Sequence, residues 1–93
     1  KIIVVMTDFP KLKIDIRSHT DSRQTAKYNN ALSERRAKST RNWLVKRGIS
    51  ANRLTAKGYG ESQLVNHCAD GVKCSEAEHQ ENRRSEFVIV SME

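Results

Sequence analysis

The chain has few proline, cysteine and aromatic residues and no long apolar run, and each scarcity argues against a class of protein. Of its 93 residues one is proline and two are cysteine, and aromatic residues make up 5%. No apolar run approaches the roughly 20 residues of a membrane-spanning helix, so we expect membrane contact only through a parent protein outside this chain. Scarce aromatic residues argue against a stacking platform for single-stranded nucleic acid. No nucleophile elbow accompanies the His and Ser residues near position 20, so we expect no enzyme, no catalytic residues and no cofactor.

Basic residues are what the chain has in excess. Lys and Arg number 17 against 11 acidic residues, giving a net charge of +6. Such a surface suits an anionic partner: nucleic acid, a membrane face or an anionic polymer. The basic residues are spread along the chain without a helix-turn-helix, RNA-recognition or OB pattern. We therefore expect no nucleic acid as a partner, and keep a basic module binding nucleic acid or protein as the alternative function.

The length allows one small domain, residues 1–93. The chain starts at Lys1 without an initiator Met or a signal peptide, which predicts a fragment or a processed product.

The order of the predicted helices and strands indicates a helix layer on one sheet, an α+β fold. In chain order the elements are a helix end at 1–9, a half-buried strand at 11–17, a helix at 26–47 ended by Gly48, a strand at 53–59, a polar insertion at 66–80, and a strand that begins at Glu81 or Asn82 with residues 87–90 buried on both faces.

Arg36 is the unusual residue of the predicted helix. At 100° per residue, it falls in the middle of the inward stripe that Leu32 and Leu44 define, together with Thr40 and Trp43. A buried guanidinium needs a carboxylate partner, and Asp21 lies in the loop that feeds the helix. One interpretation is an internal Arg36–Asp21 salt bridge. The other is a shared cleft in which the two charges meet the two poles of a zwitterionic ligand.

Four motifs in order carry a resemblance to a known family. They are HTDS at 19–22, YNNALSERRAKS at 28–39, GISANRLTAKGYGES at 48–62 and NRRSEFVI at 82–89. Over about residues 12–90 the sequence resembles the OmpA-like C-terminal domain, which OmpA-type proteins, the Pal lipoprotein and the stator protein MotB share. The resemblance implies a β-α-β-α-β two-layer sandwich, with helices packed on one face of a small mixed sheet.

The resemblance also implies a ligand and a place in the cell. The domain would bind peptidoglycan non-covalently through the diaminopimelate of its stem peptide, and so anchor the outer membrane to the cell wall. It would act in the periplasm as part of a Gram-negative outer-membrane protein, or else of a Pal-type lipoprotein or a stator anchor. Asp21 would meet the ammonium and Arg36 the carboxylate of diaminopimelate. The remaining ligand-binding residues would be Asn29, Thr20, Leu32, Asn82 and Arg83.

The chain departs from the family pattern at three places. Ser18 stands where Gly usually precedes His-Thr-Asp, and SRQTAK at 22–27 lacks a glycine that is common there. The family's opening strand lies upstream of Lys1, so the domain is N-terminally truncated. An unpaired sheet edge would permit strand exchange between two copies, giving a homodimer.

Cys68 and Cys74 flank a predicted Asp70-Gly71 turn. Five intervening residues let the sulfurs meet in a disulfide. Zinc bound with His67 and His79 is an alternative, but its usual C-x₂₋₄-C spacing is narrower, and two free thiols are a third. The sequence is similar to OmpA-family proteins of Bacteroidetes-type bacteria, in which a periplasmic disulfide is expected. We therefore predict a disulfide and no metal.

Overall fold

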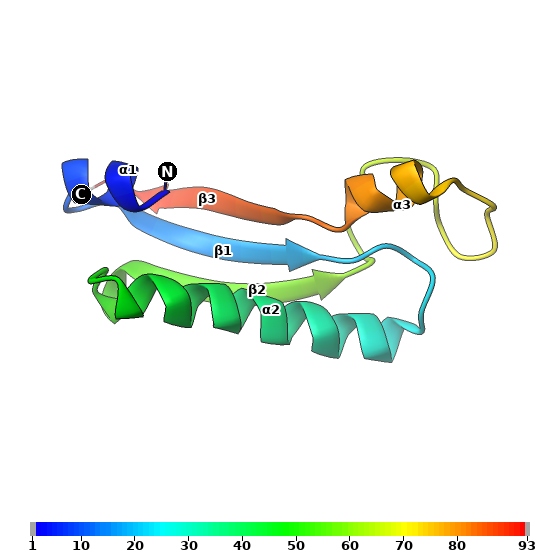
Figure 1. The fold of residues 1–93 in the computed structure, drawn as a ribbon, viewed down its shortest axis with the longest axis horizontal. Helices are drawn as coiled ribbons and strands as arrows, with labels where there is room; N and C mark the ends of the chain where they lie inside the picture. The colour runs from blue at the N-terminus through cyan, green and yellow to red at the C-terminus, as the bar shows by residue number, and fades with distance from the viewer. Residues whose placement is uncertain (1, 93) are drawn as a thin grey trace.

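A three-stranded mixed sheet forms the centre of the protein in the computed structural model, which describes residues 2–92. Its order is β2-β1-β3, so β1 (Lys13–His19) pairs in parallel with β2 (Leu54–Gly60) and antiparallel with β3 (Ser85–Ser91). The remaining elements are α1 (Ile2–Asp8), α2 (Ala26–Lys46), the 3₁₀ turn η1 (Ala51–Arg53) and α3 (Glu76–Asn82), and Figure 1 shows α2 running along the sheet. None of the described helices combines the length and apolar character that crossing a membrane would need.

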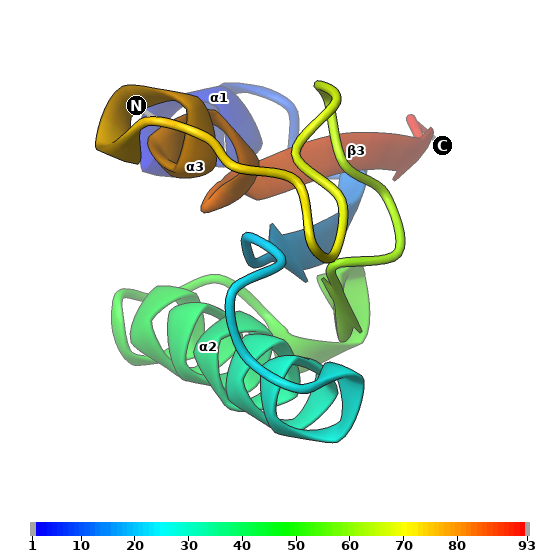
Figure 2. The ribbon, with the colours of Figure 1, turned by 90° about the vertical axis from the view of Figure 1, so that its right-hand side faces the viewer.

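The helices gather on one face of the sheet, as predicted (Figure 2). Strand β1 explains why, because its side chains alternate: Ile14 and Ile16 are buried, whereas Asp15 and Arg17 are only half-buried on the opposite face. The core contains residues of α1, β1, α2, β2 and the loops beside them: Met6, Leu12, Ile14, Ile16, Ala37, Leu44, Ile49 and Leu54. The prediction of an α+β sandwich is therefore confirmed.

Helix α2 begins and ends where its capping residues predict. The Thr25 hydroxyl accepts a hydrogen bond from the backbone N–H of Tyr28 at the start. At the other end Gly48 has φ +100°, and the N–H of Ile49 donates to the carbonyl of Leu44. This is a Schellman motif, and both Ile49 and Leu44 are buried.

Most of the side chains that α2 buries are small or polar, and Leu44 is the large apolar one among them. The buried residues of α2 are Asn29, Ser33, Ala37 and Leu44, whereas Arg36 and Trp43 are exposed, so the predicted inward stripe is right at Leu44 but wrong at Arg36 and Trp43. The cause is the close approach of α2 to β2. A Cβ built on Gly58 would lie 2.1 Å from the backbone nitrogen of Glu34, which leaves no room for large side chains between the two backbones.

The last strand differs from its prediction in both start and burial. Asn82 ends α3, and β3 begins at Ser85. Phe87 and Ile89 pair with Ile16 and Ile14 of β1 and share their face, yet they are 40% and 56% exposed. The prediction of burial on both faces is wrong because β3 forms the edge of the sheet farthest from α2.

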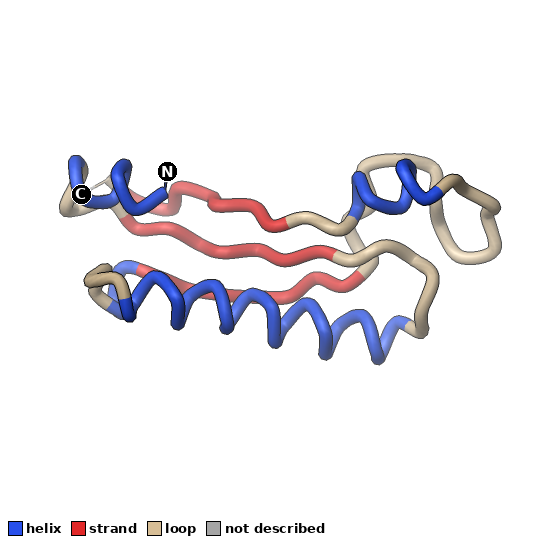
Figure 3. The backbone as a smooth tube through the Cα atoms, in the orientation of Figure 1, coloured by secondary structure: helices blue, strands red, loops and turns tan. Residues whose placement is uncertain are grey.

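The predicted polar insertion holds a helix that its composition did not indicate. A long loop leads from β2 to α3, which Figure 3 shows as one tan stretch followed by a short blue helix. Helix α3 starts with a capping box, because the Ser75 hydroxyl accepts from the N–H of Glu78 while the Glu78 carboxylate accepts from the N–H of Ser75. The pattern Ser-x-x-Glu is the sequence signal for such a start.

Candidate ligand-binding site

A cavity of about 300 Å³ lies beyond the carboxyl end of β1, between the loop at 20–25 and the first half of α2. Figure 2 shows this loop passing from the sheet to the start of α2. The cavity is lined by Thr20, Asp21, Arg23, Gln24, Tyr28, Asn29, Leu32, Arg36 and Arg83. The structure thus brings six of the seven predicted ligand-binding residues together.

Asp21 supplies the negative charge of the cavity. It is 6% exposed. Its Oδ2 accepts hydrogen bonds from Arg23 at 2.8 Å and from Arg83 at 2.7 Å, and its Oδ1 accepts from the backbone N–H of Arg23 at 3.0 Å. Burial acts to raise the pKa of Asp21, but these hydrogen bonds from Arg23 and Arg83 outweigh it and hold the pKa well below its ordinary value. Asp21 is therefore ionised.

The two arginines that hold Asp21 are themselves held by Glu76 of α3. Arg23 donates to Glu76 at 2.8 Å, and Arg83 donates both to Glu76 and to Gln80. Hydrogen bonds from Arg83 and Arg23 lower the pKa of Glu76. The network contains two guanidinium groups and two carboxylates, so its formal charge is zero, and it joins the loop after β1 to α3.

Arg36 stands apart from this network. It is exposed at the rim of the cavity, and among residues 2–92 no carboxylate is paired with its guanidinium. The interpretation of an internal Arg36–Asp21 salt bridge is wrong, because Asp21 is paired with Arg23 and Arg83 instead. The guanidinium of Arg36 is therefore the uncompensated positive charge of the cavity.

Asn29 and Thr20 shape the loop that forms one wall. The side-chain nitrogen of Asn29, which is 2% exposed, donates to the backbone carbonyls of Asp21 and Gln24 at 3.1 and 3.3 Å. The Thr20 hydroxyl also donates to the carbonyl of Asp21, at 2.9 Å. Leu32 is half-buried and contributes apolar surface. These contacts fix the backbone on which the Asp21 carboxylate is presented.

Asn82, the seventh predicted residue, lies outside the cavity lining. Its side-chain oxygen accepts from the N–H of Val65 at 2.8 Å, and its nitrogen donates to Asn66 at 2.9 Å. Asn82 therefore holds the loop between β2 and α3. Conversely, Arg23 lines the cavity and was not predicted, because the SRQTAK loop was judged only by the glycine that it lacks.

His19 lies outside the lining of this cavity. Its ring is 1% exposed, stacks on Tyr59 and lies 3.1 Å from the Glu86 carboxylate. Burial lowers the pKa of His19. The contacts are those of a packed side chain.

The predicted disulfide between Cys68 and Cys74 is present, with Cα atoms 6.0 Å apart. Cys68 is buried, and its carbonyl accepts a hydrogen bond from the hydroxyl of Ser22. This bond fastens the loop between β2 and α3 to the loop at 20–25. The residues that come together around the disulfide are His67 and Glu78, whereas His79, the second histidine of the zinc alternative, is not among them.

Fold and cavity together define a small α+β domain whose central strand ends at a cavity lined by a carboxylate and by guanidinium groups. The sequence matches the OmpA family over residues 1–78, and the chain belongs to that family.

Relatives show how widely this module occurs. The peptidoglycan-associated lipoprotein of Rhizobium meliloti is 38% identical over 84 residues, which cover 90% of this chain and 45% of the lipoprotein. Photosystem I P700 chlorophyll a apoprotein A2 of Gloeobacter violaceus is 40% identical over 91 residues, which cover 96% of this chain and 10% of that protein. The chain thus spans less than half the length of these relatives, and the match concerns a domain.

A solved structure has the same architecture. The crystal structure of the peptidoglycan-associated lipoprotein from Burkholderia pseudomallei superposes with a TM-score of 0.82 at 28% identity, over 95% of this chain and 70% of that one. The resemblance to this family that the motifs carry is confirmed.

Proposed function

We propose that this domain binds peptidoglycan without covalent chemistry and holds the diaminopimelate of the stem peptide in the cavity between Asp21 and Arg36. The observation that carries the proposal is the uncompensated guanidinium of Arg36 at the rim of a cavity that also holds the ionised Asp21. Relatives named peptidoglycan-associated lipoproteins support the same ligand.

The chemistry of the two charges suits the free end of diaminopimelate, which carries an ammonium and a carboxylate on one carbon. Arg36 offers a planar pair of N–H donors to the carboxylate, which a lysine does not. In Asp21, Oδ2 already accepts from two arginines, whereas Oδ1 accepts only from a backbone N–H. Oδ1 is therefore the atom that receives the ammonium.

The expected affinity of one site is modest. Each charge-assisted hydrogen bond contributes about 1.5–3 kcal/mol net, so three of them near the upper value give a micromolar site at roughly −8 kcal/mol. Many copies along one wall polymer would hold together through avidity. The domain would then act in the periplasm as the wall-binding part of an envelope protein, which fits the Pal-type relatives.

Sedimentation with insoluble peptidoglycan tests the proposal, and the chain offers a matched control. Arg35 and Arg36 are adjacent, exposed and equally charged, but only Arg36 lines the cavity. We expect Arg36→Ala to abolish co-sedimentation and Arg36→Lys to weaken it, while Arg35→Ala binds like the unaltered chain. If Arg35→Ala and Arg36→Ala lose co-sedimentation equally, the interaction is a general attraction between a basic surface and an anionic polymer, and the cavity is refuted as the binding site.

Titration with free diaminopimelate identifies the group that is bound. We expect amide chemical shifts to change at Asp21, Asn29 and Arg36. Co-sedimentation without such shifts would retain peptidoglycan as the ligand and overturn diaminopimelate as the part recognised.

A further inference from the structure

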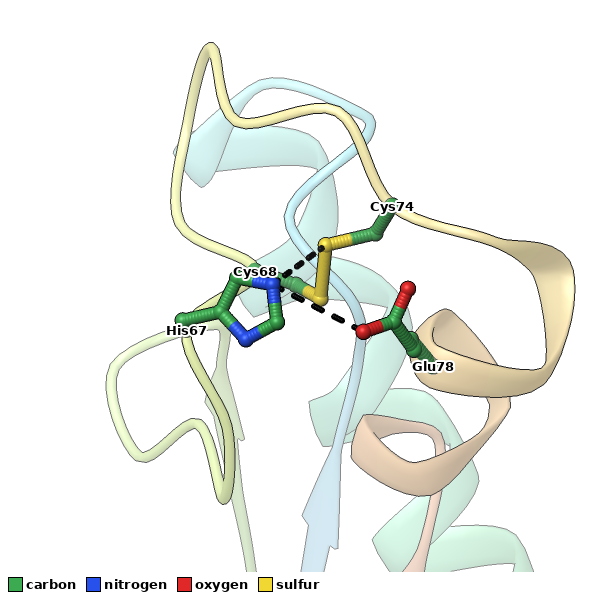
Figure 4. Close-up of side chains that lie close together, drawn as sticks. All are labelled: His67, Cys68, Cys74 and Glu78. Atoms are coloured by element: carbon green, nitrogen blue, oxygen red, sulfur yellow. Dashed lines mark hydrogen bonds and ion pairs between the residues drawn. A yellow bond between two sulfur atoms is a disulfide. The ribbon is translucent and has the colours of Figure 1, made fainter.

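Four side chains with metal-binding atoms meet beside α3. His67, Cys68 and Cys74 lie on the loop between β2 and α3, and Glu78 lies in the first turn of α3. Their ligand atoms are all within 4.8 Å of one another, and Figure 4 shows the imidazole of His67 and the carboxylate of Glu78 on either side of the two sulfurs. None of the four lines the cavity assigned to diaminopimelate.

The spacings around the imidazole of His67 suit zinc, whereas the two sulfurs are joined in the disulfide and would have to separate. Zn²⁺ prefers four ligands in a tetrahedron, with bonds of about 2.0 Å to nitrogen or oxygen and 2.3 Å to sulfur, which places ligand atoms roughly 3.3–3.8 Å apart. Nε2 of His67 lies 3.8 Å from Sγ of Cys74 and 3.6 Å from Oε2 of Glu78. Imidazole, carboxylate and two thiolates are all established zinc ligands.

The redox state of the cysteines decides whether the site exists. Thiolates bind metals, and the disulfide occupies both sulfurs. We propose that reduction of the Cys68–Cys74 bond converts this cluster into a Zn²⁺ site with His67, Cys68, Cys74 and Glu78 as ligands. A dithiol supplies two electrons: the protein S–S bond breaks, two cysteine thiols form, and the dithiol closes to its own disulfide. Zn²⁺ then displaces the two thiol protons, which pass to water.

Hydrogen bonds that do not involve the disulfide hold the ligands in place. Oε1 of Glu78 accepts from the backbone N–H of Ser75 at 2.9 Å, which leaves Oε2 turned toward His67. The N–H of Cys68 donates to Asn66 at 3.1 Å, and Asn66 donates to the carbonyl of Glu78 at 2.9 Å. The loop therefore stays fastened to α3 after reduction. These hydrogen bonds orient the ligands, as hydrogen bonds to metal-binding side chains do in zinc proteins generally.

An ion can reach the cluster from water. The side chain of His67 is 67% exposed and that of Glu78 39%, whereas Cys68 is buried. The buried sulfur lies on the protein side and the imidazole on the solvent side. Disulfide and zinc thus become two mutually exclusive ways to close the same loop.

Binding of Co²⁺ and Zn²⁺ to the full chain, reduced with a phosphine that is kept in the buffer, tests the proposal. We expect one Co²⁺ per chain with the visible bands of tetrahedral coordination, displacement by Zn²⁺, and release of two protons per ion near pH 7. The oxidised chain serves as the reference and should give none of these signals. Absence of tetrahedral Co²⁺ bands in the reduced chain, at micromolar protein and ion, would overturn the proposal.

Variants show whether all four ligands take part. Glu78→Gln keeps the capping box, since Gln also accepts from the N-cap N–H, but it removes the carboxylate. Loss of a residue that only hydrogen-bonds to a metal ligand already weakens metal binding by about 10–100-fold, so we expect Glu78→Gln and His67→Ala each to weaken Zn²⁺ binding by at least about tenfold. Asp70→Asn, in the same loop but outside the cluster, should leave it unchanged. Zinc affinity that is insensitive to both Glu78→Gln and His67→Ala would mean a site made by the cysteines alone and would refute the assignment.

Discussion

Replacing Gly58 by alanine would place a methyl group inside the contact between β2 and α2. The new Cβ would lie 2.1 Å from the backbone nitrogen of Glu34 and 2.4 Å from the hydroxyl oxygen of Ser33. Backbone atoms of a helix cannot turn aside as a side chain can, so α2 must move away by on the order of 1 Å to regain van der Waals separation.

The energetic cost follows from what this movement breaks. Overpacking a close contact costs about 1–3 kcal/mol. Two hydrogen bonds cross the same contact, from the N–H of Gly58 to Glu34 and from the N–H of Gly60 to Ser33, both at 2.8 Å. Weakening each costs about 0.5–1.5 kcal/mol, and the lower entropy of the unfolded alanine chain returns about 0.4–1 kcal/mol. We expect Gly58→Ala to lower the free energy of unfolding by about 3 kcal/mol.

Urea unfolding followed by circular dichroism measures this loss. With a slope of about 1 kcal/mol per molar urea for a chain of this size, the midpoint should fall by about 3 M. Gly71→Ala is the control, because Gly71 has φ +80° and open space around its Cβ position, so only backbone strain of about 1–2 kcal/mol applies. If Gly58→Ala unfolds at the same urea concentration as the unaltered chain, or costs less than Gly71→Ala, the close approach of α2 to β2 does not govern stability.

Two further predictions concern single interactions. The folded pKa of Asp21 is depressed, so this group stabilises the fold above its unfolded pKa of about 3.9, and the stabilisation is lost as pH falls through the lower folded value. Asp21→Asn should therefore have a lower free energy of unfolding than the unaltered chain at neutral pH, and it should lose less of this free energy on acidification. If the free energies of unfolding of the two chains change with pH in parallel, the ion pairs of Asp21 with Arg23 and Arg83 are contradicted. Ser75→Ala removes a cap of α3 and should cost about 1 kcal/mol of unfolding free energy. Ser75→Asp should restore this free energy. Equal stability of the unaltered chain, Ser75→Ala and Ser75→Asp would show that the cap contributes nothing.

Local patterns in the sequence predicted much of the fold. The alternation of Ile14 and Ile16 with charged residues was enough to predict the strand β1, and Gly48 predicted the end of α2. The helix orientation was missed because large apolar residues were taken to define the buried face. At Gly58 the approach of two backbones selects small residues instead, and only the three-dimensional contact reveals it.

The site was predictable to the extent that family motifs mark it. Helical spacing singled out Arg36 and its loop partner Asp21, although it placed Arg36 wrongly in the buried stripe, and the resemblance then gave both residues their roles toward the ligand. The pairing of Asp21 with Arg83 joins residues 62 positions apart, so no local pattern contains it. Helix α3 had a readable signal in Ser75 and Glu78, but the polar composition of the insertion concealed it.

The cavity lies at one end of an elongated body of 44 × 20 × 19 Å, and the first and last described elements, α1 and β3, reach the other end (Figure 1). Helix α1 and the end of β3 lie at one tip, and the loop at 20–25 with α3 lies at the other (Figure 1). A pull between a ligand in the cavity and the opposite tip therefore runs along the strand axes. Hydrogen bonds between β1 and its two neighbours would be sheared together and not opened one after another. Single-molecule stretching along this axis should then need more force than stretching across the sheet, a mechanical property suited to a domain that bears load.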